Sequence, residues 1–189
     1  MSVLQLHKLF LDAPDAWQAL AQNRPSARRL FLMLVLPVSL IPPLMLEYAG
    51  HHLGPLLLPH APAQAWTTAA LAFLLAELAT VPLMAWAIKS IAESKGIASD
   101  YRDAFMLAAI APVPMWLSSL VLVSEQLPLI ALMLALGVAG WVVLVFRGVK
   151  SVLRVEEGLI AFDIAYTVTA LGLIAWVVVV MNGLIPLLS

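Results

Sequence analysis

The sequence predicts an all-α, polytopic membrane protein with five transmembrane helices and a short N-terminal interfacial helix. The first observation behind this prediction is composition, because 63% of the 189 residues are hydrophobic and only 11% are charged. A soluble domain of this length needs a polar surface that so few charges cannot supply. The second is that the apolar residues form five long runs, and the third is that every basic residue lies on one side of them. We therefore treat residues 1–189 as a single membrane domain.

Each apolar run is long enough to cross the hydrocarbon core, which takes about 20 helical residues. Only residues 124–126 separate the third run from the fourth, so these two are expected to form a tight hairpin. The fifth run is longer than a span requires and must tilt, or end near Asn182 with a short apolar tail. The expected spans are residues 30–49, 66–88, 104–123, 127–146 and 159–188.

The basic residues indicate how the chain is oriented in the membrane. Four precede the first span, three flank the segment between spans two and three, and three lie between spans four and five. Because basic residues remain in the cytoplasm, the N-terminus is expected inside and the C-terminus outside. An alternative with four spans and one re-entrant hairpin would place residues 147–154 outside. The ten basic residues are Lys8, Arg24, Arg28, Arg29, Lys89, Lys95, Arg102, Arg147, Lys150 and Arg154.

Residues 12–22, before the first span, have the pattern of a short helix. Asp12 can cap its N-terminus and Pro14 suits its first turn. Trp17 and Leu20 then share one face. We expect this helix to lie in the cytoplasmic interface of the membrane, with its apolar face toward the acyl chains.

Composition and motifs also exclude several classes of function. The formal net charge is −1 and there is no basic tail, so nucleic acid is not an expected partner. Cysteine is absent, which excludes disulfides, cysteine metal sites and thiol nucleophiles. The sequence contains no HExxH, no GxSxG and no glycine-rich phosphate loop. We therefore expect neither a catalytic site nor a cofactor, and we interpret Glu156 and Glu157 as the solvated start of the last span.

Three acidic residues, Glu47, Glu77 and Asp163, lie inside or at the edge of spans and form a candidate intramembrane polar site. At a rise of about 1.5 Å per residue, Asp163 lies near the cytoplasmic end of its span, Glu77 near the middle and Glu47 near the outer end. No basic residue lies deep enough to pair with Glu77, so we expect it to be protonated or beside water. Two interpretations follow. The acids form a proton- or cation-handling site, or a neutral Glu77 hydrogen-bonds to a neighbouring helix.

The segment after the first span contains the weak elements of a metal site. Glu47 and His51 are four residues apart, and His52 and His60 are nearby. Glutamate and histidine at this spacing can hold a divalent metal. However, no third ligand has a fixed spacing, and the glycines of this segment favour a turn. Solvated histidines at the interface are therefore the favoured interpretation, and no metal is expected.

Prolines and small residues recur within the spans. Prolines can kink helices that line a cavity, or they can be packing features. Small residues that recur on one face allow close helix packing, inside one chain or between chains. The prolines are Pro37, Pro42, Pro43, Pro82, Pro112 and Pro114. The small residues are Ala135, Gly137, Ala139 and Gly140 in span four, and Ala161, Ala165, Thr169 and Gly172 in span five.

Three stretches together resemble the Yip family, the Ypt/Rab-interacting membrane proteins, in its bacterial form. They are the N-terminal "LDAPDAWQAL", the approach to span three "GIASDYRDAFMLAAIAPVPMWLSSL", and "RGVKSVLRVEEGLIAF" before span five. The resemblance implies five spans, a cytoplasmic N-terminus and no catalytic residue. Eukaryotic relatives are linked to Rab GTPases, but fewer than 30 residues precede span one here. We therefore do not expect binding of a Rab-type GTPase.

These observations favour a membrane scaffold, adaptor or membrane-organising protein without a catalytic site. The expected location is the bacterial inner membrane, and the expected partners are the lipid bilayer, other membrane proteins or further copies of the chain. The alternative is a small proton- or cation-handling transporter or channel that uses Glu77. The surroundings of Glu77 distinguish the two, because transport needs a polar cavity that is connected to solvent.

Overall fold

The computed structural model describes residues 25–188, and this part of the chain contains helices and no strand. Five of the helices are long and apolar enough to cross a membrane. They contain all five runs expected from the sequence, so the all-α, five-helix fold is confirmed. Their bounds are Ala27–His52, Ala63–Ser94, Tyr101–Ser124, Leu127–Val152 and Gly158–Leu188. The expected interfacial helix, residues 12–22, lies outside the described residues.

The first span is a chain of short helical pieces. Pro37, Pro42 and Pro43 each lack the N–H that a continuous helix would use, and this accounts for the interruptions. A π-helical turn precedes Pro37, and a further short helix follows the span. The pieces are α3 (Ala27–Leu30), the π-helical turn (Phe31–Val35), α4 (Leu36–Ser39), α5 (Ile41–His52) and α6 (Gly54–Leu57).

The second span, α7 (Ala63–Ser94), continues six residues beyond its expected end at Ile88. A salt bridge of 3.4 Å between Lys89 and Glu93, one turn apart, supports this polar extension. The helix ends where Gly96 adopts a left-handed φ of 77°. The backbone N–H groups of Gly96 and Ile97 then bond to carbonyls of the last turn at 3.0 Å.

The third span is broken into α8 (Tyr101–Ile110), α9 (Val113–Ser118) and a 3₁₀ segment (Ser119–Ser124). The break between α8 and α9 falls at Pro112, as expected for a proline that cannot continue the hydrogen-bond ladder. This span is the most enclosed, with 56% of its apolar window buried against 22–39% for the others. It packs against α7 through α8, and against α10 through both α8 and α9.

The fourth span, α10 (Leu127–Val152), and the fifth, α11 (Gly158–Leu188), complete the bundle. Only Glu125 and Gln126 join the third span to α10, and Glu125 adopts a left-handed φ of 56°. The expected tight hairpin is therefore confirmed. At Gly137 a Cβ would lie 2.8 Å from the Cβ of Ser118, so the small residue permits close packing of α10 on α9 within the chain.

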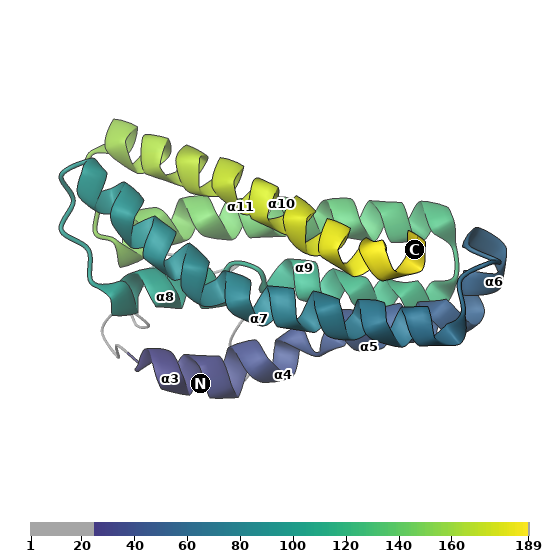
Figure 1. The fold of residues 1–189 in the computed structure, drawn as a ribbon. Coiled ribbons are helices and arrows are strands. Elements are labelled where there is room, and N and C mark those ends of the chain that lie inside the picture. The colour runs from purple at the N-terminus through teal and green to yellow at the C-terminus, as the bar shows by residue number, and fades with distance from the viewer. Residues whose placement is uncertain (1–24, 189) are drawn as a thin grey trace.

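The helices run alternately between two ends of the bundle (Figure 1). The start of α3, the α7–α8 loop and the α10–α11 loop lie at one end, and α6, the start of α10 and the end of α11 lie at the other (Figure 1). All basic residues among residues 25–188 belong to the first end. The described histidines, His51, His52 and His60, belong to the second.

Candidate functional site

A partly open cavity of about 350 Å³ lies within the bundle, and all five spans contribute to its wall. Most of the lining is apolar, and among the described residues Glu77 is its one ionisable side chain. The α7 residues that line the cavity recur at intervals of three or four, so they share one face of the helix. They are Phe73, Glu77, Thr80, Val81, Met84 and Ile88. A carboxyl group that the sequence places at mid-span therefore faces into this cavity.

Glu77 is buried, with 8% of its surface exposed. The indole of Trp116, on α9, lies close enough to interact with its carboxyl group. One carboxyl oxygen, Oε2, is buried and has no hydrogen-bond partner in the described part of the protein. Hydrogen bonds within single helices occupy the neighbouring hydroxyl groups, because Thr80 donates to the carbonyl of Ala76 and Ser119 to that of Trp116, each at 2.7 Å. Glu77 therefore keeps one oxygen available for a donor.

Three tryptophans from different helices line the same cavity: Trp116 of α9, Trp141 of α10 and Trp176 of α11. The break at Pro112 starts α9, the helix that carries Trp116. Trp141 packs so closely against Gly172 of α11 that a Cβ there would overlap its ring. The cavity therefore combines one carboxyl group with three indole rings.

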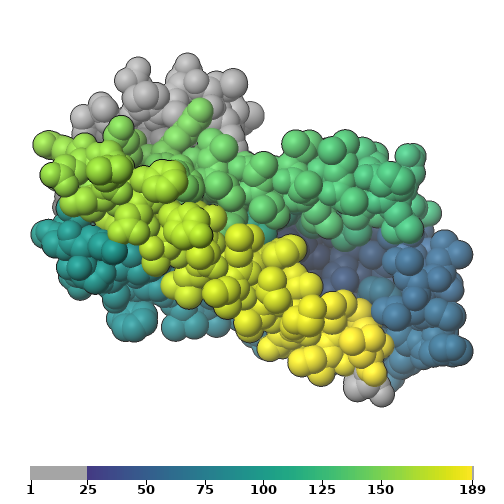
Figure 2. Space-filling view, turned by 90° about the horizontal axis from the view of Figure 1, so that it is seen from above, coloured from purple at the N-terminus to yellow at the C-terminus, as the bar shows by residue number. Residues whose placement is uncertain are grey.

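The cavity reaches the surface at the side of the bundle. Its lining includes Leu134 of α10 and Val180 and Leu184 of α11, which belong to the half of these helices where the hairpin turn and the C-terminus lie. Figure 2 shows a hollow between α10 and the C-terminal half of α11, with the first span at its floor. We refer to this cavity and its opening between α10 and α11 as the lateral cleft.

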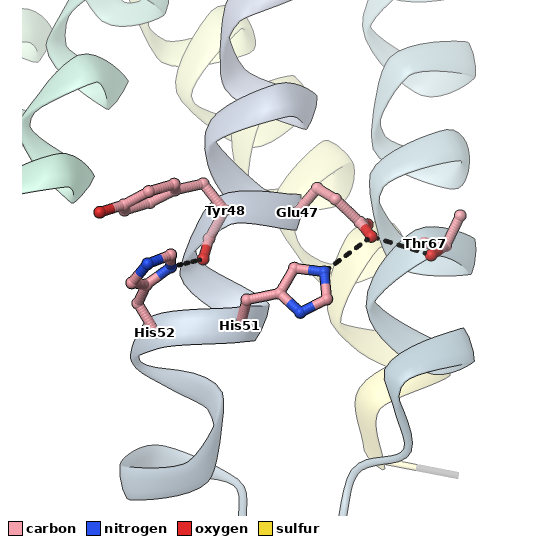
Figure 3. A network of polar contacts seen from close by, with 5 residues as sticks. All are labelled: Glu47, Tyr48, His51, His52 and Thr67. Carbon is pink, nitrogen blue, oxygen red and sulfur yellow. Dashed lines mark hydrogen bonds and ion pairs between the residues drawn. The ribbon is translucent and has the colours of Figure 1, made fainter.

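Glu47 occupies a separate polar cluster at the second end of the bundle (Figure 3). Its Oε1 accepts a hydrogen bond of 3.0 Å from Thr67 of α7 and lies 3.7 Å from His51 Nε2. Its Oε2 is buried without a hydrogen-bond partner in the described residues. The expected turn at Gly50 is wrong, because α5 continues through this residue and thereby places Glu47 and His51 on one helix face. The cluster joins α5 to α7.

Tyr48 points away from Glu47 and joins α5 to the hairpin turn (Figure 3). Its hydroxyl group donates a hydrogen bond of 3.4 Å to Glu125, and its ring stacks on His52 with centroids 3.9 Å apart. His52 Nδ1 lies 2.9 Å from the backbone carbonyl oxygen of Tyr48. The two neighbouring histidines, His51 and His52, are thus directed to different partners.

The weak metal candidates do not form a ligand set in residues 25–188. Glu47 and His51 approach each other, but His52 interacts with Tyr48 instead. No group of three His, Asp or Glu side chains suited to a metal occurs among the described residues. His60 lies beyond α6 and is exposed. The segment therefore contains an acid–histidine pair without a third ligand.

Asp163 forms a salt bridge of 2.6 Å with Lys95, which follows α7. Both side chains are substantially exposed, at 50% and 40% respectively. The pair joins the first turns of α11 to the α7–α8 loop, at the end of the bundle opposite Glu47. The structure thus places Glu47, Glu77 and Asp163 in three separate environments, and Glu77 alone lines the lateral cleft.

The comparison with family models decides the assignment of the chain. A model described as Yip1 domain matches residues 8–179, which is nearly the whole chain. The chain belongs to the Yip1 family. The resemblance drawn from three sequence stretches is therefore confirmed. No curated protein and no solved structure matches the chain.

The match covers most of the candidate site of this Yip1-domain protein. It includes the three candidate acids, Glu47, Glu77 and Asp163. It also includes the three tryptophans that line the lateral cleft. It stops within α11, so Gly183 and Leu184, which also line the cleft, lie beyond it. The Yip1 domain thus identifies the chain as a membrane protein with several apolar helices, and its activity must be argued from the residues themselves.

Proposed function

We propose that this Yip1-domain protein is a non-enzymatic membrane scaffold or adaptor that organises the bilayer and the membrane proteins around it. We place it in the bacterial inner membrane, with the N-terminus in the cytoplasm and the C-terminus in the periplasm. The concentration of basic residues at one end of the bundle supports this orientation. The separation of the three acids supports a scaffold over a proton path, because Glu47 contacts Thr67, Asp163 contacts Lys95, and Glu77 alone lines the lateral cleft.

The length of α11 is the observation that carries the proposal. The helix has 31 residues, of which Asp163 alone is charged. At about 1.5 Å per residue it is roughly 46 Å long, whereas the hydrocarbon core is about 30 Å thick. Even at a tilt of about 40°, the upper end of the usual range, it would project roughly 36 Å along the bilayer normal. Tilting alone therefore does not bring its apolar ends inside the core.

The ends of α11 expose large apolar side chains. Leu159 is 88% exposed and Leu188 is 75% exposed. A bilayer that thickens around the helix, or a neighbouring protein that covers these ends, removes them from water. Either response changes the membrane next to the protein. This physical coupling is what a membrane-organising scaffold requires.

Clustering of labelled protein in vesicles of different acyl-chain length tests the proposal. We expect energy transfer between copies to be strong in thin bilayers and to fall as the chains lengthen. Leu159→Lys combined with Leu188→Lys should remove most of this dependence, since it shortens the apolar part of α11. The matched control is Leu56→Lys, in the exposed α6 outside the spans. Clustering that ignores bilayer thickness would rule the proposal out.

Movement of protons or cations through Glu77 is a second candidate function. The buried, unpartnered Oε2 in a partly open cavity favours it. Flux assays in proteoliposomes test it, with Glu77→Gln as the variant that removes the acid and keeps the shape of the side chain. Flux that Gln abolishes would support this function. Flux no greater than that of empty liposomes would reject it.

A further inference from the structure

The lateral cleft has the composition of a small-molecule site. Pockets for small ligands enclose about 300–1,000 Å³ and combine apolar and aromatic walls with few polar groups. The lateral cleft has a volume of about 350 Å³, three indole rings and one carboxyl group. An α-helix is about 10–12 Å in diameter, so the cleft is too small for a transmembrane helix of a partner. Its size therefore favours a compact ligand.

The unpartnered oxygen of Glu77 determines the charge of that ligand. Oε2 is buried and without a partner, and a carboxylate accepts hydrogen bonds or pairs with a cation. Among the lining residues that the structure describes, Glu77 is the only ionisable one, so no basic side chain of residues 25–188 in the wall neutralises it. An occupant that carries a positive charge would satisfy both the oxygen and the charge balance.

The surrounding side chains favour an organic cation over a metal ion. Hard metal ions need several oxygen ligands or retained water. Here the hydroxyl hydrogens of Thr80 and Ser119 are committed to backbone carbonyls, and the remaining wall is almost entirely apolar. A cation covered by hydrocarbon groups is weakly hydrated and loses little on entering such a wall. Aromatic rings also attract such cations, and tryptophan does so most strongly.

The position of the opening indicates the route of entry. The lateral cleft opens between α10 and α11, at the side of the bundle that faces hydrocarbon in a five-span arrangement (Figure 2). Amphiphilic cations partition into bilayers, so they reach this opening without crossing water. Met84 and Met115 also line the cleft, and their flexible thioethers adapt to irregular apolar shapes.

We propose that the lateral cleft binds a lipophilic organic cation that enters from the bilayer between α10 and α11. The positive centre lies against the carboxylate of Glu77, and the hydrocarbon groups lie against Trp116, Trp141 and Trp176. A proton and the ligand compete for the same carboxylate, so binding to a protonated Glu77 breaks its O–H bond and releases the proton to solvent. This inference does not depend on the scaffold proposal, and it requires binding at Glu77 but no flux.

Binding of tetraphenylphosphonium to the purified full chain in lipid nanodiscs tests the inference. We expect saturable binding, followed by equilibrium dialysis and by quenching of tryptophan fluorescence, that is tighter at alkaline than at acidic pH. Glu77→Gln should weaken it by about tenfold or more, equivalent to at least about 1.4 kcal/mol, and should remove its pH dependence. Glu47→Gln is the matched control, because Glu47 lies outside the lateral cleft, and it should bind as the unaltered chain does.

Two further measurements guard against a folding defect and against simple partitioning. Val180→Trp leaves Glu77 intact but fills the cleft from α11, and it should also abolish saturable binding. Triphenylphosphine oxide, a neutral compound of similar shape, should bind weakly and equally to the unaltered chain and to the Gln variant. Equal affinity of the unaltered chain for both compounds, or undiminished phosphonium binding by both variants, would overturn the inference. Binding without flux would leave it standing and reject transport.

Discussion

At the scale of the residue, the two oxygens of the Glu77 carboxyl group have different surroundings. Trp116 from α9 lies close enough to interact with the group, whereas Oε2 is buried without a partner in the described residues. The contact with Trp116 joins α7 to the third span at mid-depth. Hydrogen bonds between membrane helices average about 0.6 kcal/mol and reach about 1.7 kcal/mol. The contact therefore contributes modestly to stability, and the free oxygen is the more unusual feature.

A double-mutant cycle measures the contact between Glu77 and Trp116. Glu77→Leu and Trp116→Phe should be coupled by about 0.5–1.5 kcal/mol in the free energy of unfolding, the scale of such bonds. Glu77→Gln should remain close to the unaltered chain, because the amide still offers an acceptor to the indole. Unfolding measured in mixed detergent and lipid micelles supplies the values. If the double variant loses only the sum of the two single losses in the free energy of unfolding, the contact contributes nothing.

The salt bridge between Asp163 and Lys95 should contribute little, although its atoms approach to 2.6 Å. Both side chains are more than a third exposed, and exposed ion pairs contribute about 0–1 kcal/mol because water and salt screen them. Asp163→Asn should therefore lower the free energy of unfolding by less than about 1 kcal/mol. The effect should shrink further at high ionic strength. A loss of several kcal/mol that salt does not reduce would contradict this assignment.

At the scale of the element, small residues determine how closely the helices approach. Gly137 lies where a Cβ would come 2.8 Å from Ser118 Cβ and 3.2 Å from the carbonyl oxygen of Pro114. Both atoms belong to or adjoin the backbone of the third span, so they cannot move unless the helix moves. The sequence pattern left open whether the small residues of α10 pack within one chain or between chains. The structure places Gly137 against α9 of the same chain.

Gly137→Ala should therefore force α9 and α10 apart. Overpacking of this kind costs about 1–3 kcal/mol, and we expect a lower free energy of unfolding in that range. Gly158→Ala is the matched control, since nothing lies within 4 Å of a Cβ at this position at the start of α11. It should be neutral or slightly stabilising. Equal melting temperatures for the two variants in detergent would show that the contact between α9 and α10 accommodates the extra methyl group without loss of stability.

At the scale of the whole molecule, the sequence predicts well how deep a residue lies in the membrane. It predicts poorly which neighbouring helix the side chain faces. The apolar runs gave the five spans, and counting along α7 placed Glu77 near mid-depth. The depth of a residue in the membrane does not determine which neighbour its side chain faces. The different depths of the three acids were therefore compatible with a single proton or cation path. The structure directs Glu47 to Thr67, and Asp163 to Lys95 at the other end.

The partners that the sequence did not reveal are distant along the chain. Trp116 is far from Glu77 in sequence, and it belongs to α9, the short helix that begins after the break at Pro112. Lys95 reaches Asp163 because α7 continues past the apolar run and then turns at Gly96. Gly172 is a local signal for the aromatic wall, because its missing side chain leaves room for Trp141. Such a signal is recognised only once the two helices are known to touch.

The topology as a whole is open to a direct experiment. A reporter fused to the C-terminus should be active in the periplasm, because five spans carry the chain across the membrane an odd number of times. A cysteine placed at Lys95, in a chain that has none of its own, should resist labelling from outside intact cells. A cysteine at His60 is the control and should be labelled. Cytoplasmic activity of the C-terminal reporter would exclude the proposed orientation.

The hairpin turn of Glu125 and Gln126 has a mechanical consequence. A connection this short holds the start of α10 next to the end of the third span, whereas a longer segment joins α10 to α11, which forms the other wall of the lateral cleft. The same helix has 31 residues and is longer than the hydrocarbon core is thick. A thinner membrane that leans α11 over should therefore change the width of the cleft. We expect the affinity for tetraphenylphosphonium to vary with acyl-chain length, so that the bilayer acts as a lever on the binding site.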